Sequence, residues 1–88
     1  MTQKPDSTRI SIAWQDPAML QIGKSGVTEG LVKEATRLLK KHRYIKVRLL
    51  RSALGESSKE EVVGSLCEAC KAKLDGFRGN TAVIYRLR

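Results

Sequence analysis

Long apolar segments are absent from this sequence of 88 residues. No run approaches the roughly 18 apolar residues of a bilayer-spanning helix, and the N-terminus lacks the apolar core of a signal peptide. Aromatic residues make up only 5% of the chain, which leaves little material for stacking against a ligand. We therefore expect no membrane association and no export, so that a cytoplasmic protein is the default.

Residues for metal binding and acid–base catalysis are equally scarce. A closed zinc site needs four ligands, whereas this chain offers Cys67, Cys70 and His42. The C-x-x-C pair falls on the apolar side of a predicted helix, while redox pairs favour a helix N-terminus. We interpret both cysteines as buried and free, with a metal-linked dimer as an alternative, and His42 as a surface residue at a helix end. We expect no metal, no cofactor and no enzymatic activity.

Acidic residues are outnumbered, and this imbalance is the most informative feature of the composition. Seventeen lysines and arginines face nine acidic residues, giving a net charge of +8. Such an excess favours a polyanionic partner or an anionic surface. With 41% hydrophobic and 30% charged residues, the chain has the composition of one folded domain with a modest core.

A short glycine-bracketed segment stands out, Gly23-Lys24-Ser25-Gly26, between an apolar run and a helical pattern. Glycines permit a tight turn and let a ligand approach the backbone closely. The following helix would offer free amides and a positive dipole end to an anion, and Lys24 adds a mobile charge. Nucleic acid is the natural first hypothesis, although an ordinary turn between a strand and a helix explains the same residues.

A phosphate-binding loop of the NTPase type is a further alternative for residues 18–25. Ala18 stands where that motif requires its first glycine, and the intervening residues 19–22 are apolar and strand-like. Such a loop needs flexible backbone to wrap phosphates, and no acidic strand end is available to hold magnesium. We therefore disfavour nucleotide hydrolysis.

Two helices are predicted from apolar spacing. The first covers 28–43, capped by Thr28 or Ser25, with Leu31, Ala35, Leu38 and Leu39 on its apolar side. Its other side carries a basic stripe that is either solvated or a binding face: Lys33, Arg37, Lys40 and Lys41. The second begins at a capping box of Ser58 and Glu61 and is electrically neutral over 59–73. Its apolar stripe consists of Val62, Val63, Leu66, Cys67, Cys70 and Leu74.

Period-two patterns predict the strands. A short strand over 18–22 delivers the glycine segment, and 44–50 places Ile45, Val47 and Leu49 opposite Lys46 and Arg48. Residues 51–57 are expected to form a loop. Gly79-Asn80 indicates a hairpin between 74–78 and 81–87, whose last strand is apolar on both faces and so central in the sheet. We expect the helices to join neighbouring parallel strands in the right-handed sense.

The N-terminal region is predicted to be a tail or arm over 1–17, ahead of a domain over 18–88. Residues 1–8 are polar without apolar periodicity. Residues 9–14 alternate Ile10, Ile12 and Trp14 with other residues, which suits a half-buried strand or an extended arm. Asp16-Pro17 then breaks the chain.

Four blocks of this sequence resemble one known family: IGKSGVTEG at 22–30, YIKVR at 44–48, LCEA at 66–69 and RGNTAVIYR at 78–86. They look like the CRM domain, the chloroplast-RNA-splicing and ribosome-maturation module that includes the bacterial YhbY proteins. The resemblance covers 18–87 in one register. It implies an RNA-binding α/β two-layer sandwich with a mixed four-stranded sheet, β-α-β-α-β-β, similar to the C-terminal domain of the third bacterial translation initiation factor.

The resemblance also implies a site and a partner. In this family the glycine segment resembles the loop by which KH domains clamp a nucleic-acid backbone. Gly23 and Gly26 would shape that loop, and Lys24 and Ser25 would contact phosphate. Further RNA-binding candidates are Lys33, Arg37, Lys40 and Lys41, with Lys46, Arg48, Arg78 and Arg86 as secondary ones. Stand-alone members are associated with precursors of the large ribosomal subunit, so we expect a monomer that binds structured ribosomal RNA or pre-ribosomal particles by shape.

One departure from the family pattern concerns the N-terminus. Members of the YhbY type carry an amphipathic helix ahead of the first strand, and residues 1–17 do not show that pattern. We expect Ile10, Ile12 and Trp14 to cover the sheet face that this helix would otherwise cover. The rival hypothesis for the whole chain is a protein-interaction module that meets an acidic partner and uses its basic surface for steering.

Overall fold

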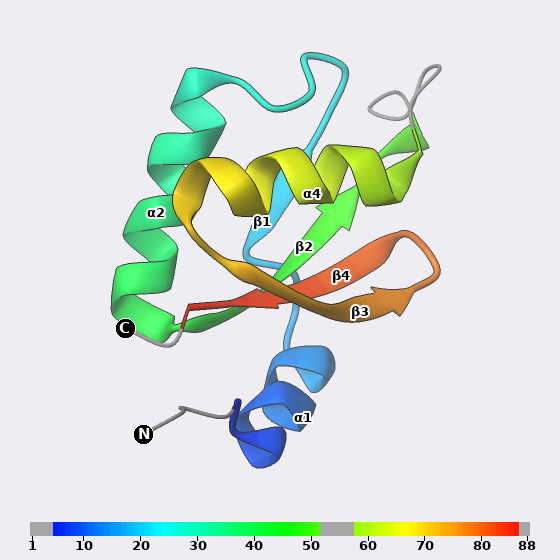
Figure 1. Cartoon of the computed structure of the whole chain (residues 1–88). Helices are drawn as coiled ribbons and strands as arrows, with labels where there is room; N and C mark the ends of the chain where they lie inside the picture. The colour runs from blue at the N-terminus through cyan, green and yellow to red at the C-terminus, as the bar shows by residue number, and fades with distance from the viewer. Residues whose placement is uncertain (1–4, 52–57, 87–88) are drawn as a thin grey trace.

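The computed structural model describes residues 5–51 and 58–86 of the chain. Its strands form one four-stranded sheet of order β1-β2-β4-β3, in which β1 and β2 are parallel and the other neighbours antiparallel. Figure 1 shows α2 and α4 together on one side of this sheet and α1 on the other. The elements are α1 (Ser7–Gln15), β1 (Leu20–Ile22), α2 (Glu29–His42), β2 (Tyr44–Leu49), α4 (Lys59–Cys70), β3 (Lys73–Arg78) and β4 (Thr81–Tyr85).

The predicted mixed four-stranded α/β fold is confirmed. Thr28 and Ser58 cap α2 and α4 by accepting from the amides of Leu31 and Glu61. The hairpin turn at Gly79-Asn80 is present, and Gly79 has a φ of +60°. One expectation was wrong: β2 and β3 are parallel but not neighbours, because β4 folds back between them. A strand that is apolar on both faces is stable only where both faces are covered.

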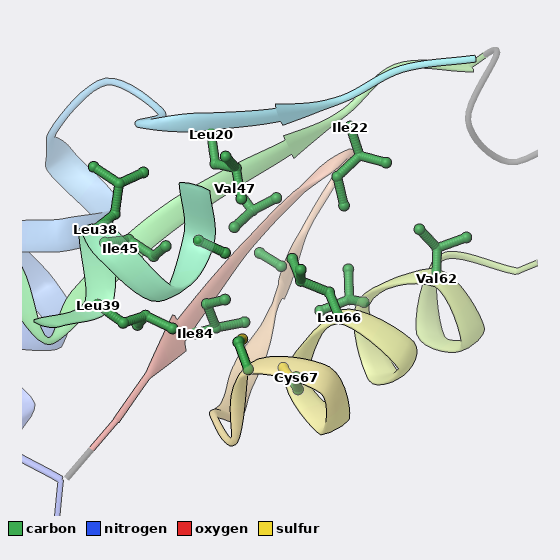
Figure 2. Close-up of a cluster of buried hydrophobic side chains, with 14 of the residues drawn as sticks. Leu20, Ile22, Leu38, Leu39, Ile45, Val47, Val62, Leu66, Cys67 and Ile84 are labelled. Carbon is green, nitrogen blue, oxygen red and sulfur yellow. The ribbon is translucent and has the colours of Figure 1, made fainter. Parts of the chain in front are cut away.

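The main core lies between the sheet and the two helices α2 and α4 (Figure 2). Ile45, Val47 and Leu49 of β2 point into it, as the alternating pattern predicted, together with Ala82 and Ile84 of β4. Helix α2 contributes Ala35, Leu38 and Leu39, and α4 contributes Val62, Val63, Leu66, Cys67 and Cys70. The apolar stripes read from the sequence therefore do face the core.

Leu74 does not belong to the stripe of α4, contrary to prediction. The helix ends at Cys70, since Lys71 adopts a left-handed conformation with φ of 57°. Leu74 lies instead on β3 and is 36% exposed. The predicted loop over 51–57 lies outside the described residues except for Arg51, which is helical.

The N-terminal segment is a helix, and the prediction of a strand or extended arm over 9–14 was wrong. Asp6 caps α1 by accepting from the amides of Thr8 and Arg9. The alternation of Ile10, Ile12 and Trp14 suggested a strand, but it gave no weight to Ala13. This small residue is the one that the helix buries. The residues that face the sheet are at positions 10, 13 and 14, a helical spacing, and Ile12 is 51% exposed.

Helix α1 packs on the sheet face opposite α2 and α4. Ala13 lies there against Tyr44, Val83 and Tyr85, and the two tyrosine rings stack with centroids 5.7 Å apart. The hydroxyl of Tyr44 accepts from the amide of Asp6 at 2.8 Å, which fixes the start of the helix. The expected covering of this face by Ile10 and Trp14 is therefore observed, in helical form and without Ile12. The domain boundary at residue 17 stays a prediction.

The docking of α1 can be tested by a pair of matched substitutions. We expect Ala13→Glu to lower the free energy of unfolding by roughly 2–4 kcal/mol, because it places a carboxylate against buried tyrosine and valine side chains. Ile12→Glu, on the exposed side of the same helix, should change it by about 0.5 kcal/mol or less. Urea denaturation of both variants measures the difference, and equal stabilities would contradict the observed packing.

Candidate functional site

The glycine loop, residues 23–26, forms a tight turn between the end of β1 and the start of α2. The amide of Gly26 donates to the carbonyl oxygen of Gly23 at 2.9 Å. Gly26 has a φ of +67°, a conformation that favours glycine, so its place in the turn is explained by backbone geometry alone. Lys24 and Ser25 occupy the tip and are exposed. The turn thus presents one cation and one hydroxyl to solvent.

Gly23 is a different case, because the fold itself does not require glycine there. Its φ is outside the left-handed region, and an added Cβ would lie 3.7 Å from Cδ1 of Leu50, an ordinary contact. The backbone of a glycine can be approached by a ligand more closely than that of any other residue. Turn geometry therefore does not account for a glycine at position 23.

The N-terminus of α2 is a weaker anion site than the sequence suggested. The helix begins three positions after Gly26, and its first turn contains the carboxylate of Glu29. Thr28, not Ser25, is the cap, and its Oγ1 accepts from the amide of Leu31 at 3.1 Å. Glu29 complements the positive end of the helix dipole and so competes with an external anion.

The basic stripe of α2 divides into a paired half and an unpaired half. Nζ of Lys33 lies 3.8 Å from the carboxylate of Glu29, and Arg37 donates to both oxygens of Glu34 at 2.6 and 3.2 Å. The hydrogen bond with Arg37 lowers the pKa of Glu34, and the same bond raises the pKa of Arg37.

Lys40 and Lys41 are exposed in the last turn and have no ion pair with any described carboxylate. They lie a helix length from the glycine loop, about 20 Å for fourteen residues. The stripe is therefore not a continuous track of free charge.

Three of the secondary candidates share the side of the sheet on which α1 packs. Lys46 is half-buried, and its ammonium donates to the carbonyl oxygens of Trp14 at 3.0 Å and Asp16 at 3.3 Å, which neutralises the C-terminal end of α1. Arg48 is exposed on the same face of β2. Arg78, at the end of β3, places its guanidinium 4.6 Å from the centre of the Trp14 ring. Lys46 thus has a structural task, while Arg48 and Arg78 are accessible.

Arg86, the fourth secondary candidate, lies apart from these. With Lys40 and Lys71 it lines a hollow of about 220 Å³ at the C-terminal ends of α2 and α4. The twelve predicted residues therefore fall into three groups rather than one: the glycine loop, the sheet face beside α1, and the basic stripe of α2 with Arg86 near its C-terminal end.

Sequence reasoning missed Arg51 as a neighbour of the glycine loop. Arg51 is exposed and follows Leu50, whose amide donates to the carbonyl oxygen of Ile22 at 3.0 Å. The position of Arg51 could have been predicted from the sequence, because parallel neighbouring strands end at the same edge of a sheet. A basic residue just after β2 must therefore lie near the loop that follows β1.

Cys67 and Cys70 are buried and free, as interpreted from the sequence. Burial, and secondarily Cys70, raises the pKa of Cys67 to about 11, and burial also raises the pKa of Cys70. Within the described parts of the chain, no three histidine, cysteine or acidic residues gather as metal ligands would. In residues 5–51 and 58–86, no helix has the length and apolarity to cross a membrane.

A family model decides the relationship. The model of the CRS1/YhbY (CRM) domain matches residues 1–86. The chain belongs to this family. Its match begins at the first residue, so the predicted departure of residues 1–17 from the family pattern was wrong, in line with the helix observed there.

Relatives of known name support the same assignment. Probable RNA-binding protein PA4753 of Pseudomonas aeruginosa is 31% identical over 98% of this chain and 81% of its own length. Probable RNA-binding protein YqeI of Bacillus subtilis is 31% identical over 77% of this chain and 69% of its own length. Probable RNA-binding protein MJ0652 of Methanocaldococcus jannaschii is 34% identical over 76% of this chain but only 49% of its own.

A solved structure shows that the fold is shared as well. The solution structure of the hypothetical protein SAV1595 from Staphylococcus aureus superposes with a TM-score of 0.74 at 30% sequence identity. The match covers 93% of this chain and 83% of the other.

The cysteine environment predicts a stability change at alkaline pH. A thiol whose pKa rises from 9.0 when unfolded to about 11 when folded keeps its proton longer in the native state. The free energy of unfolding should therefore fall as pH rises from about 9 to 11, since the unfolded chain releases its proton first. Urea denaturation under reducing conditions should show a smaller fall for Cys67→Ala than for the wild type. Parallel pH profiles would contradict the assigned burial.

Proposed function

We propose that this protein is a non-catalytic RNA-binding module whose primary contact is the glycine loop, residues 23–26. Three relatives carry the name of probable RNA-binding proteins, and the net charge of +8 suits a polyanion. The observation that carries the proposal is the freedom of position 23. A glycine that the fold does not require, next to an exposed lysine and serine on a fixed turn, suits close approach of a sugar–phosphate backbone.

Within this module the loop residues have separate tasks. Gly26 sets the turn, Gly23 admits the RNA backbone, and Lys24 and Ser25 bind phosphate oxygens by a charge and a hydroxyl hydrogen bond. Arg51 and Arg48 lie near this edge of the sheet and add positive potential. Lys40, Lys41 and Arg86 are far from the loop, so they contact only an RNA large enough to span the module.

We further propose structured ribosomal RNA, in precursors of the large subunit, as the target in the cytoplasm. Exposed aromatic rings are few, so stacking on unpaired bases contributes little and recognition depends on RNA shape. Structured RNA suits this mode of recognition, because its rigid fold holds phosphates close together at fixed positions. The protein acts as a monomer in this proposal.

The loop can be tested directly by its tip residues. We expect the double substitution Lys24→Ala with Ser25→Ala to weaken binding of a structured ribosomal RNA fragment by about tenfold, equivalent to about 1.4 kcal/mol. The slope of log affinity against log salt should become shallower by roughly 0.7 for a lost phosphate contact. Fluorescence anisotropy at several salt concentrations gives both values.

Two controls separate this proposal from charge attraction of other kinds. Duplex DNA at the same salt should bind more weakly than the RNA. The control variant Lys71→Ala with Ser65→Ala removes one lysine and one serine side chain at positions outside the loop, and it should weaken RNA binding less than the loop variant does. Equal affinity for RNA and DNA, unaffected by the loop substitution, would refute the proposal and favour the protein-interaction alternative.

The two glycines predict opposite patterns of stability and binding. Gly23→Ala should change the free energy of unfolding by about 1 kcal/mol or less and yet weaken RNA binding, because the new methyl group meets only Leu50 until RNA arrives. Gly26→Ala should lower that free energy by roughly 1–2 kcal/mol through its φ of +67°. Thermal unfolding and RNA titration of both variants test this, and full RNA affinity of Gly23→Ala would contradict a backbone clamp.

A further inference from the structure

The sheet face on which α1 lies is organised as three rows of residues that cross the strands. Strand register and alternation place Tyr44, Tyr85 and Lys73 in one row, the tyrosine row. Lys46, Val83 and Gly76 form the middle row. Gln21, Arg48, Thr81 and Arg78 form the third, which we call the arginine row and which alone crosses all four strands.

Helix α1 covers these rows unequally. Tyr44 and Tyr85 are each only 9% exposed beneath it, and Val83 of the middle row is fully buried. Lys46 is held at the C-terminal end of the helix by its hydrogen bonds to Trp14 and Asp16. In the arginine row, by contrast, Gln21, Arg48 and Arg78 are exposed and Thr81 is half-buried. The helix therefore stops short of this last row.

The arginine row contains two cations and no acidic residue. Neither arginine forms an ion pair with a carboxylate of the described residues, whereas Lys33 and Arg37 on α2 both do. The carboxylate of Asp75 on β3 accepts a hydrogen bond from Nε1 of Trp14 at 3.3 Å. Arg48 and Arg78 are two strands apart, about 10 Å between backbones. A guanidinium group without a carboxylate partner is well suited to bind phosphate.

The arginine row is continuous with the glycine loop. Gln21 pairs with Arg48, and the chain passes from Gln21 through Ile22 directly into Gly23. The amide of Leu50 extends the same pairing by donating to Ile22. An RNA strand clamped at residues 23–26 therefore meets this end of the sheet before it could reach the far end of α2.

We propose that the arginine row is a second RNA-backbone site, in which Arg48 and Arg78 each bind a phosphate of the strand held by the glycine loop. This inference rests on the proposed function and adds a direction to it: the RNA crosses the sheet face beside α1, not the face covered by α2 and α4. Trp14 holds Arg78 in place by the 4.6 Å contact of its ring with the guanidinium.

The test compares two charge-matched double variants. Arg48→Gln with Arg78→Gln removes two accessible arginines, and Lys33→Gln with Arg37→Gln removes two paired cations of α2. With a fluorescent ribosomal RNA fragment, we expect the first to weaken binding at least tenfold and to reduce the salt slope by about 1.4, twice the roughly 0.7 per phosphate. The variant Lys33→Gln with Arg37→Gln should lose much less RNA affinity. Arg48→Lys with Arg78→Lys should keep most of the salt slope, because the charge remains.

Trp14 offers an independent readout, since it is the only tryptophan of the chain. RNA that binds Arg78 should change Trp14 emission in the wild type and change it less in the Arg48→Gln, Arg78→Gln variant. Thermal unfolding confirms that each variant is folded. Equal or greater loss in the α2 variant would overturn the proposal, as would unchanged Trp14 emission on saturation with RNA.

The outcomes for the loop and the row are distinguishable. Loss of binding on substitution of Lys24 and Ser25 but not of the arginines would overturn the arginine row and leave the proposed function intact. Loss with the arginines alone would support the row and overturn the loop as the primary contact. Binding of polyglutamate with the affinity of RNA, and with the same sensitivity to the arginine substitutions, would overturn an RNA site in favour of an acidic protein partner.

Discussion

The central strand β4 imposes the main constraint on this fold, because it is buried on both faces. Ala82 and Ile84 point to one side, Val83 and Tyr85 to the other, and all four are 9% exposed or less. One layer of helices cannot bury such a strand. Helices α2 and α4 cover the first side, and α1 must cover the second. The N-terminal helix thus supplies the cover that this face of the sheet requires.

The same constraint determines which part of the sheet stays open. Nine helical residues span only about 14 Å, so α1 reaches across the tyrosine and middle rows and leaves the arginine row uncovered. The parallel pairing of β1 with β2 then brings the glycine loop to the same edge. Loop and arginines come from segments more than twenty positions apart in sequence, and only the register of the sheet unites them.

Much of the fold was predictable from local patterns. The stripe of α2, the alternation of β2 and the Gly79-Asn80 turn each involve one period or one turn type, and each was read correctly. Helix α1 was not, since its buried position is Ala13, a small residue that carries little hydropathy signal between two isoleucines and a tryptophan. The central place of β4 was predicted from its two apolar faces, whereas the expectation that the parallel strands β2 and β3 are neighbours was wrong.

The candidate site was predictable only in part. Sequence spacing identifies cations but not the groups that neutralise them. Lys33 and Arg37 resemble free charges until Glu29 and Glu34 are seen beside them, although a glutamate three or four positions away on a helix already indicates such pairing. Lys46 could not have been recognised at all, since its partners are carbonyl oxygens of a helix thirty positions earlier.

Trp14 and Lys46 link the position of α1 to the surface beside it. Lys46 bonds the end of the helix to β2, and Trp14, in the last turn of that helix, contacts Arg78 on β3 and donates to Asp75. Movement of α1 would therefore expose Tyr44 and Tyr85 and at the same time release Arg78 from its aromatic support. Packing of the core on this face and the orientation of Arg78 therefore depend on the same helix. Although its apolar pattern is weak, α1 fixes the position of an arginine in the exposed arginine row.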